Sequence, residues 1–389
     1  MAHDRRFRFG IQLSQPLAGL SWAESARKAE DLGFSTLFLP DHFGDQLAPI
    51  PAMMAAADAT TTLNVGALVF DNDYKHPVVM AKEIATIDQL SGGRVEFGLG
   101  SGWMKSDYDE SGIPYDAPKV RVERFFEGVE IIKGLWSEEP VNFSGEHYTI
   151  TGLNGLPKPA RAGGPPLLIG GGAPRMLRFA GAHADIVGVN PSIHSGAIDG
   201  EAARDGAADR FDQKLQWVRE GAGDRFDDIE LNVLVFLAQI TDDPTGVAEM
   251  MAPLFGTTPD LMAEAPLALF GTEVELFGSG AEPLKLQAEL RPLPVECAVA
   301  APVPHRRANT RRQESGDNVA AKVELDAAPH IATLIHRSVG PKFAADQPLR
   351  ERIGNATIVA GADLHAQRGR MFDTELAHHA IGRRENGIE

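Results

Sequence analysis

The chain has 389 residues, a formal net charge of −17 and a single cysteine, Cys297. This length can bury a sizeable core, the negative charge disfavours nucleic acid and anionic membranes as partners, and one cysteine excludes an intramolecular disulfide framework. The N-terminal residues are charged and lack the apolar stretch of a secretory signal, and no apolar run reaches the length of a membrane span, so a cytoplasmic location is predicted.

Seven apolar, β-rich segments before residue 272 are predicted to be strands. The first four begin roughly every 30 residues with helical patterns between them, which is typical of βα units around a parallel sheet. The predicted strands are residues 7–13, 36–39, 63–70, 95–99, 167–169, 185–189 and 231–240.

Two of the intervening helices have clear boundaries. Ser21 and Glu24 form a capping-box pattern at the start of a helix that Gly33 ends. Pro77 opens a later helix at a favoured first-turn position. Residues 138–166 form an irregular insertion with a small predicted hairpin, and eight-fold barrels commonly accept such insertions.

The composition of the chain changes near residue 272. All four Trp and all four Tyr precede it, and the earlier part holds 22 basic and 38 acidic residues against 15 and 16 in the later part. Residues 283–312 are rich in Pro, Ala and Arg without a helical or strand period, which indicates a linker or disorder. Two later stretches, 332–339 and 353–360, fit a short helix or strand. We therefore predict a barrel domain over 1–272 and an atypical, poorly ordered tail over 273–389.

Residues 8–271 resemble the luciferase-like monooxygenase family, within it the subgroup that uses coenzyme F420 rather than FMN. The motifs that carry the resemblance are residues 38–43, 69–77, 88–103, 168–173 and 269–272. The resemblance implies an α/β fold, a luciferase-like (βα)8 TIM barrel. After Thr272 the sequence departs from the family, so we expect the eighth βα unit to be missing or replaced by the tail, with a frameshift or fusion as the explanation.

Asp41 and His42 follow the second predicted strand, at the end of a barrel where chemistry takes place. A histidine beside an aspartate can exchange a proton near neutral pH. The alternative is a capping Asp and a structural His. The resemblance places a His of this region near the reactive face of the deazaflavin, so His42 and Asp41 are the predicted catalytic residues.

Phe70, Asp71 and Asn72 end the third predicted strand. Taken alone, they read as an ordinary Asx-rich turn. The resemblance instead implies a non-proline cis peptide bulge at this point that supports the back face of the cofactor ring. All three are therefore predicted to bind the cofactor.

A glycine-rich segment follows the fourth predicted strand and superficially resembles a dinucleotide fingerprint. That fingerprint requires a helix that begins at once, whereas we expect residues 104–112 to form a loop. In a barrel the glycines let the backbone approach the cofactor ring or ribityl chain, and the tryptophan forms a wall, although core packing is the commoner role of a Trp. The predicted cofactor-binding residues here are Gly98, Gly100, Ser101, Gly102 and Trp103.

Gly170, Gly171 and Gly172 end the fifth predicted strand just before a helical pattern. Free N–H groups at a helix start bind phosphate, and Arg175 adds local positive charge, although a tight turn also explains the glycines. No metal site is predicted, because the histidines are scattered. Weaker candidates for cofactor contact are Lys105, Asp107 and Tyr108.

The resemblance implies an F420-dependent oxidoreductase that transfers a hydride between the deazaflavin and an unidentified small organic substrate. One alternative is an FMN-dependent two-component monooxygenase. The other is an inactive product with an incomplete barrel, in which the first and seventh strands would be open edges. The expected partners are the small-molecule substrate, a second copy of the chain in a homodimer, and an F420 or flavin reductase that supplies the hydride, with no nucleic acid or membrane.

Overall fold

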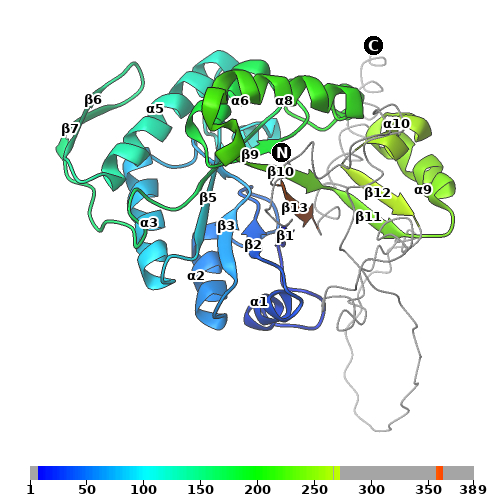
Figure 1. Cartoon of the computed structure of the whole chain (residues 1–389), viewed down its shortest axis with the longest axis horizontal. Helices are drawn as coiled ribbons and strands as arrows, with labels where there is room; N and C mark the ends of the chain where they lie inside the picture. Colours follow the sequence, from blue (N-terminus) through cyan, green and yellow to red (C-terminus); the bar gives the residue numbers. More distant parts are fainter. Residues whose placement is uncertain (1–7, 266, 272–355, 362–389) are drawn as a thin grey trace, which may run out of the picture.

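A ring of parallel strands forms the centre of the molecule (Figure 1). The computed structural model describes residues 8–265, 267–271 and 356–361. Within these residues each strand of the ring pairs in parallel with the next, and the last pairs with the first. In order, the strands are β1 (Arg8–Gln12), β2 (Thr36–Leu39), β3 (Asn64–Ala67), β5 (Val95–Gly100), β8 (Leu167–Gly171), β9 (Ile186–Val189), β10 (Glu230–Val235) and β13 (Ala356–Gly361).

The strand β13 comes from the part of the chain after residue 272 and lies between β1 and β10. Val359 pairs with Gly10 on one side and with Leu234 on the other. The prediction that the tail replaces the eighth unit is thus confirmed for its strand, whereas the expected open edges on the first and seventh strands are wrong. The physical reason is that residues 356–361 are apolar and partly β-branched, so they can complete the hydrogen bonds of both neighbours. Cys297 and residues 283–312 and 332–339 lie outside the described residues.

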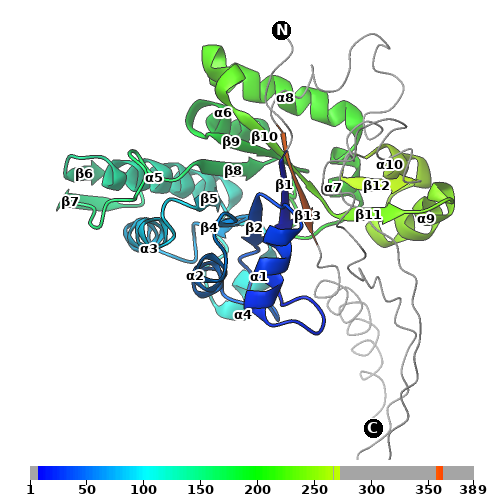
Figure 2. The ribbon, with the colours of Figure 1, turned by 60° about the horizontal axis from the view of Figure 1, so that its bottom comes forward.

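Helices surround the ring, as Figure 2 shows. The Ser21 capping box is confirmed, because the Ser21 side chain accepts from Glu24 N and Glu24 accepts from Ser21 N at 2.7 Å. Pro77 occupies the first turn of its helix, as predicted. Among the described residues, no helix is both long and apolar enough to span a membrane. The outer helices are α1 (Trp22–Asp31), α2 (Pro49–Ala59), α3 (Pro77–Leu90), α5 (Pro118–Trp136), α6 (Pro174–His183) and α8 (Ala208–Ala222).

The predicted strand over 231–240 is wrong in one respect, because it divides into two strands in different sheets. After β10 the chain leaves the ring, and β11 (Leu237–Ile240) pairs in parallel with β12 (Ala268–Gly271). Together with α9 (Pro244–Met251) and α10 (Pro259–Glu264), these strands form a small lobe beside the barrel (Figure 1). The predicted hairpin is present as β6 (Val141–Ser144) and β7 (Thr149–Leu153). The remaining short elements are β4 (Phe70–Asp71), α4 (Lys105–Ser111), α7 (Gly200–Asp205) and the 3-10 helices η1 (Gly223–Asp228) and η2 (Ala252–Phe255).

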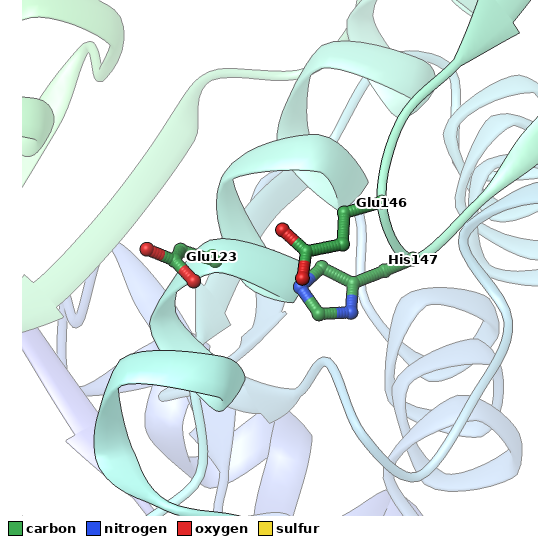
Figure 3. Close-up of side chains that lie close together, drawn as sticks. All are labelled: Glu123, Glu146 and His147. Atoms are coloured by element: carbon green, nitrogen blue, oxygen red, sulfur yellow. The ribbon is translucent and has the colours of Figure 1, made fainter.

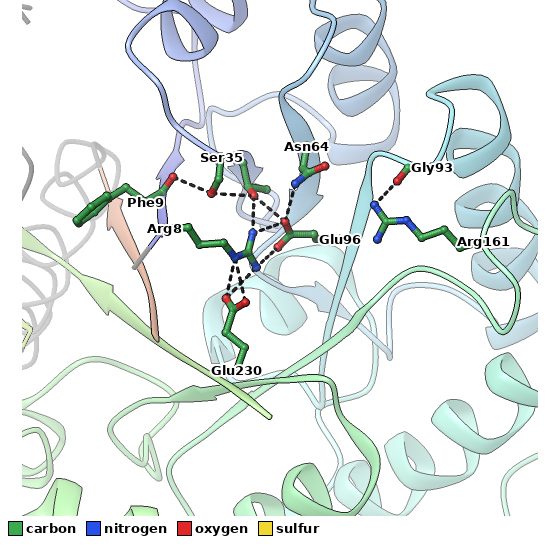
Figure 4. A network of polar contacts seen from close by, with 9 residues as sticks. Arg8, Phe9, Ser35, Asn64, Gly93, Glu96, Arg161 and Glu230 are labelled. Carbon is green, nitrogen blue, oxygen red and sulfur yellow. Dashed lines mark hydrogen bonds and ion pairs between the residues drawn. The ribbon is translucent and has the colours of Figure 1, made fainter. Parts of the chain in front are cut away.

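The N-terminal ends of the strands form a polar floor inside the ring (Figure 4). Arg8 Nε lies 2.9 Å from Glu230 Oε1, and Arg8 Nη2 lies 2.9 Å from Glu96 Oε2. Thr36 and Asn64 donate to Glu96 Oε1 at 2.7 and 3.1 Å. One guanidinium group thus connects β1, β5 and β10.

Above the floor, the Phe38 ring fills the centre of the barrel and is fully buried. A Cβ atom at Gly10 would lie 2.9 Å from this ring, and one at Gly66 would lie 3.0 Å from it. The aromatic ring excludes a side chain at Gly10, and at Gly66 the ring and the Glu96 carbonyl oxygen, 2.5 Å from the same Cβ position, do so together. The C-terminal ends of the strands therefore form a separate mouth above a solid interior.

Candidate functional site

His42 lies at the barrel mouth in a hydrogen-bonded group with Asp107 and Tyr74. His42 Nδ1 is 2.7 Å from Asp107 Oδ2, and the Tyr74 hydroxyl donates to the same oxygen at 3.1 Å. Asp107 is 1% exposed. Burial acts to raise the pKa of Asp107, but the bonds from His42 and Tyr74 outweigh it and lower the pKa below its ordinary value. The Asp107 carboxylate is therefore ionised at neutral pH and holds the imidazole ring in one orientation.

The second nitrogen of His42 faces a different environment. Among the described residues, no hydrogen-bond partner contacts Nε2, and the side chain is 24% exposed. The Trp103 ring lies edge-on to the imidazole, with ring centroids 5.5 Å apart and planes at 88°. The structure thus brings together two predicted site residues from the loops after β2 and β5, and leaves Nε2 available to a ligand.

Asp41 binds the neighbouring loop. Its Oδ2 accepts from the backbone N–H of Asp71 at 3.1 Å, which joins the end of β2 to β4. Burial raises the pKa of Asp41. The contact gives Asp41 a structural role beside His42.

The segment of β4 lies close to its predicted place, but its side chains face protein. The non-proline cis peptide bond joins Leu68 to Val69, so it precedes the predicted position at residues 70–72. The Phe70 ring packs on Phe97 with centroids 6.1 Å apart, and Asp71 and Asn72 are both buried. The half-buried side chains just before β4 are those of Leu68 and Val69.

The glycines of β5 and its following turn accommodate protein atoms. A Cβ atom at Gly98 would overlap the carbonyl oxygen of Ala67, and one at Gly100 would lie 2.8 Å from Val69 Cγ2. These contacts supply a packing reason for residues that the sequence assigned to a cofactor. Ser101 is half-buried directly after β5.

The segment after Trp103 differs from the prediction, because α4 occupies most of the expected loop. The segment Lys-Ser-Asp-Tyr-Asp-Glu-Ser has few apolar residues. No helix was predicted there because apolar residues do not recur at helical spacing. Tertiary bonds from Asp107 and Tyr108 hold this short helix in place. The dinucleotide reading stays excluded, since β5 belongs to a closed ring rather than an open sheet.

Gly170 and Gly171 end β8, and Gly172 follows the strand before α6. A Cβ atom at Gly171 would lie 2.5 Å from Met176 Cγ, and one at Gly172 would overlap the backbone of the loop after β9. No side chain caps α6, so backbone N–H groups of its first turn are open in the described structure. Arg175 lies in this turn as predicted, and its Nη2 is 3.2 Å from Glu123 Oε1.

Sequence reasoning missed the loop after β9, which completes one side of the mouth. Gly196 O accepts from Lys105 N at 3.1 Å, so this loop packs against the start of α4. Asp205 Oδ2 accepts from Ser192 N at 2.7 Å and is itself paired with Lys214 at 2.8 Å. The sequence carries no local signal for this loop, because the burial of Lys214 and its pairing with Asp205 are visible only in the folded chain.

Glu123, Glu146 and His147 form a second group of polar side chains, on α5 and the β6–β7 turn (Figure 3). Their ligand atoms lie within 4.8 Å of one another. Glu123 already contacts Arg175 at 3.2 Å and Lys119 at 3.9 Å, so its charge is balanced by cations. The group shares no residue with the mouth.

A cavity of about 250 Å³ lies beside β4 and the start of α3. Arg124 crosses its wall and pairs with Asp73 and Asp116, each at 2.8 Å. Both carboxylates are thus neutralised by one guanidinium group. The cavity is lined by Asn72, Asp73, Lys75, His76, Ile113, Pro114, Asp116, Arg124 and Tyr148.

Comparisons with known proteins found relatives of this chain by sequence. The chain is 30% identical over 170 residues to an F420-dependent glucose-6-phosphate dehydrogenase of Amycolatopsis mediterranei, which covers 42% of this chain and 50% of the relative. It is 30% identical over 185 residues to a 5,10-methylenetetrahydromethanopterin reductase of Archaeoglobus fulgidus, covering 48% and 53%. The chain thus spans about half the length of these curated relatives.

The fold is similar to that of solved barrels. The coenzyme F420 dependent tetrahydromethanopterin reductase of Methanopyrus kandleri superposes with a TM-score of 0.52 at 22% identity, over 70% of this chain and 77% of that chain. The sequence profile of one family, described as luciferase-like monooxygenase, matches residues 12–289. The match covers most of the chain and all the strands of the ring except β1's first residues and β13. The chain therefore belongs to the luciferase-like monooxygenase family.

Proposed function

We propose that this chain is an F420-dependent oxidoreductase that transfers a hydride between the deazaflavin and a small organic substrate. The observation that carries the proposal is His42, whose Nδ1 is bonded to a buried carboxylate while Nε2, beside Trp103, has no hydrogen-bond partner among the described residues. The relatives that are named F420-dependent support the choice of cofactor.

The residues at the mouth fit a flat, anionic cofactor. Val69 and Trp103 provide apolar surface, because both are half-buried at the strand ends. The uncapped first turn of α6 offers N–H donors, and Arg175 offers a guanidinium group for a phosphate. When bound, the deazaflavin supplies the hydride chemistry, and the chain supplies orientation and electrostatics.

His42 would move the proton that accompanies hydride transfer. Since Asp107 accepts a bond at Nδ1, the lone pair of the neutral ring lies on Nε2, where it can take a proton from a substrate hydroxyl. The ionised Asp107 then stabilises the imidazolium. In the reverse direction, Nε2–H returns the proton to a substrate oxygen.

The test is a fluorescence titration of the purified chain with coenzyme F420, with FMN as the competitor. We expect saturable binding of F420 that FMN does not displace. Tight binding of FMN together with oxygen consumption by the reduced FMN complex would overturn the proposal in favour of a monooxygenase. Binding of neither cofactor would also contradict it.

A further inference from the structure

The hydroxyl group of Tyr108 lies between two carboxyl groups behind the mouth. Its oxygen is 2.8 Å from Asp71 Oδ2 and 3.1 Å from Asp73 Oδ2. A tyrosine hydroxyl has one hydrogen, so it donates to only one of them. A second linear hydrogen bond to the tyrosine oxygen forms only when the other carboxyl group is protonated and donates to it.

The surroundings of the two acids show which one holds the proton. Asp73 Oδ1 accepts from Arg124 Nε at 2.8 Å, and this ion pair favours the ionised form of a side chain that is 2% exposed. Asp71 accepts from Asp73 N at 2.8 Å but forms no ion pair among the described residues. Of the two acids, Asp71 is therefore the one that is protonated more readily.

The groups that face Asp71 from the neighbouring elements support this assignment. They are the carboxyl of Asp41 after β2, the carboxyl of Asp73 and the phenol of Tyr74 in the loop after β4, and the hydroxyl of Tyr108 on α4, with Arg124 of α5 paired to Asp73. Asp71 is 7% exposed. Burial, with a smaller contribution from the negative charge of Asp73, raises the pKa of Asp71 to about 7.

Gly102 shows how tightly this contact is built. Its φ is +75°, and a Cβ atom there would lie 2.5 Å from Asp71 Oδ2 and overlap the Tyr108 hydroxyl. Any larger residue would separate the acid from the tyrosine. The missing side chain at Gly102 therefore leaves the space in which Asp71 and Tyr108 form their hydrogen bond.

We propose that Asp71 is a positioning residue that acts as a neutral acid, and that through Tyr108 it fixes the helix α4 that presents Asp107 to His42. Asp107 and Tyr108 are consecutive residues of the seven-residue α4. When Asp71 loses its proton, two carboxylates compete for one hydrogen, and α4 is held less firmly. The effect on turnover rests on the proposed oxidoreductase function, whereas the proton on Asp71 does not.

The protonation of Asp71 can be measured without any cofactor. In protein labelled with ¹³C at the Asp carboxyl carbons, we expect one signal that titrates near pH 7 and that is missing from Asp71→Asn. A midpoint below about 5, close to the ordinary range of an aspartate, would overturn the proposal.

The positioning role is tested by the pH profile of F420-linked turnover. The amide of Asp71→Asn can donate to the Tyr108 oxygen as the protonated acid does, so this variant should keep the neutral-pH rate and lose the fall in rate above pH 7. The wild type should lose up to about tenfold in rate per pH unit above the midpoint, as its protonated fraction falls. Tyr108→Phe should be slow at every pH.

The matched control is Asp109→Asn, which removes a charge from an exposed position of α4 that pairs with Lys105. It should retain the wild-type pH profile. A profile of Asp71→Asn identical to that of the wild type would contradict the positioning role. If no F420-linked turnover is found, the proposed function fails, while the carboxyl titration still decides whether Asp71 is protonated.

Discussion

At the floor of the barrel Arg8 lies between Glu96 and Glu230, whereas at the mouth the buried Asp71 and the half-buried Asp41 form no ion pair among the described residues. Near the floor, backbone N–H groups outweigh burial and lower the pKa of Glu30 to about 2, while at the mouth burial raises that of Asp71 to about 7. At the floor, carboxylates that are paired with Arg8 or bonded to N–H groups stabilise the fold. At the mouth, carboxyl groups without an ion pair among the described residues can exchange protons. This division matches the general separation of stability and catalysis between the two faces of such barrels.

The largest effect is expected from breaking β13, because this strand runs from the floor to the mouth. Val359→Pro removes a backbone N–H and places a proline in a central strand, which should cost about 3 kcal/mol or more. Thermal unfolding should lose its cooperativity, and F420 binding should disappear with it. Val359→Ala keeps the N–H and should melt cooperatively. Normal stability of the proline variant would show that β13 does not close the ring in solution.

The second prediction concerns the mouth, where a substitution should lower turnover without lowering the melting temperature. His42→Gln should lower turnover by about 10²- to 10⁴-fold, because the proton acceptor at Nε2 is lost. Its melting temperature should stay close to that of the wild type, since the ring is partly exposed and Asp107 keeps the Tyr74 bond. His183→Gln, on the outer helix α6, is the control and should retain turnover. Unaltered turnover of His42→Gln would exclude the catalytic role.

The third prediction concerns the floor, where a substitution should lower stability without changing cofactor affinity. Arg8→Met leaves Glu96 as a buried charge without its guanidinium partner, so the free energy of unfolding should fall by about 3 kcal/mol. F420 affinity of the folded fraction should not change. Arg178→Met removes an exposed partner of Glu220 and should cost less than about 1 kcal/mol. Equal losses in the two variants, measured by urea unfolding, would contradict the special role of the floor.

The smallest effect concerns Glu30, which accepts backbone N–H bonds from Thr62 at 2.5 Å and from Leu63 at 3.0 Å. Its folded-state pKa of about 2 lies below the ordinary value of 4.5, so its contribution is present above pH 4.5 and is lost as the pH falls toward 2. Glu30→Gln should therefore be less stable by about 1 kcal/mol at pH 7 and equal to the wild type near pH 2. Asp31→Asn is the exposed control.

The stability that Asp71 contributes should depend on pH in the direction opposite to that of Glu30. Its folded-state pKa is raised, so the native state holds more protons than the unfolded chain, and stability relative to Asp71→Asn should fall as the pH rises from about 4 to about 7. Melting curves of both variants across this range check the sign. A stability difference that rises with pH would show that Asp71 is ionised.

Much of the ring could be predicted from the sequence, because each strand is a short apolar run that carries its own signal. The starts of α1 and α3 could also be predicted from local signals, because Ser21 and Pro77 act on adjacent backbone groups. The division of residues 231–240 into β10 and β11 was not predictable, because both halves are equally apolar and only pairing with β12 separates them.

The site was predicted in part. His42 and Trp103 follow strand ends, so their meeting at the mouth follows from a parallel ring. The bond between His42 and Asp107 joins residues 65 positions apart, and no local pattern specifies it. The assignments of Gly98 and Gly102 to a cofactor did not anticipate that Ala67, Tyr108 and Asp71 occupy the space beside them.

The sequence by itself determined the parallel βα order, the acidic surface and the His42 loop, because these depend on composition and on short-range periodicity. Only the tertiary structure decided that a strand from beyond residue 355 completes the ring and that the Tyr108 hydroxyl lies 2.8 Å from Asp71 Oδ2. Both depend on contacts between distant segments, where burial and geometry, rather than residue type, set the hydrogen bonds and the pKa.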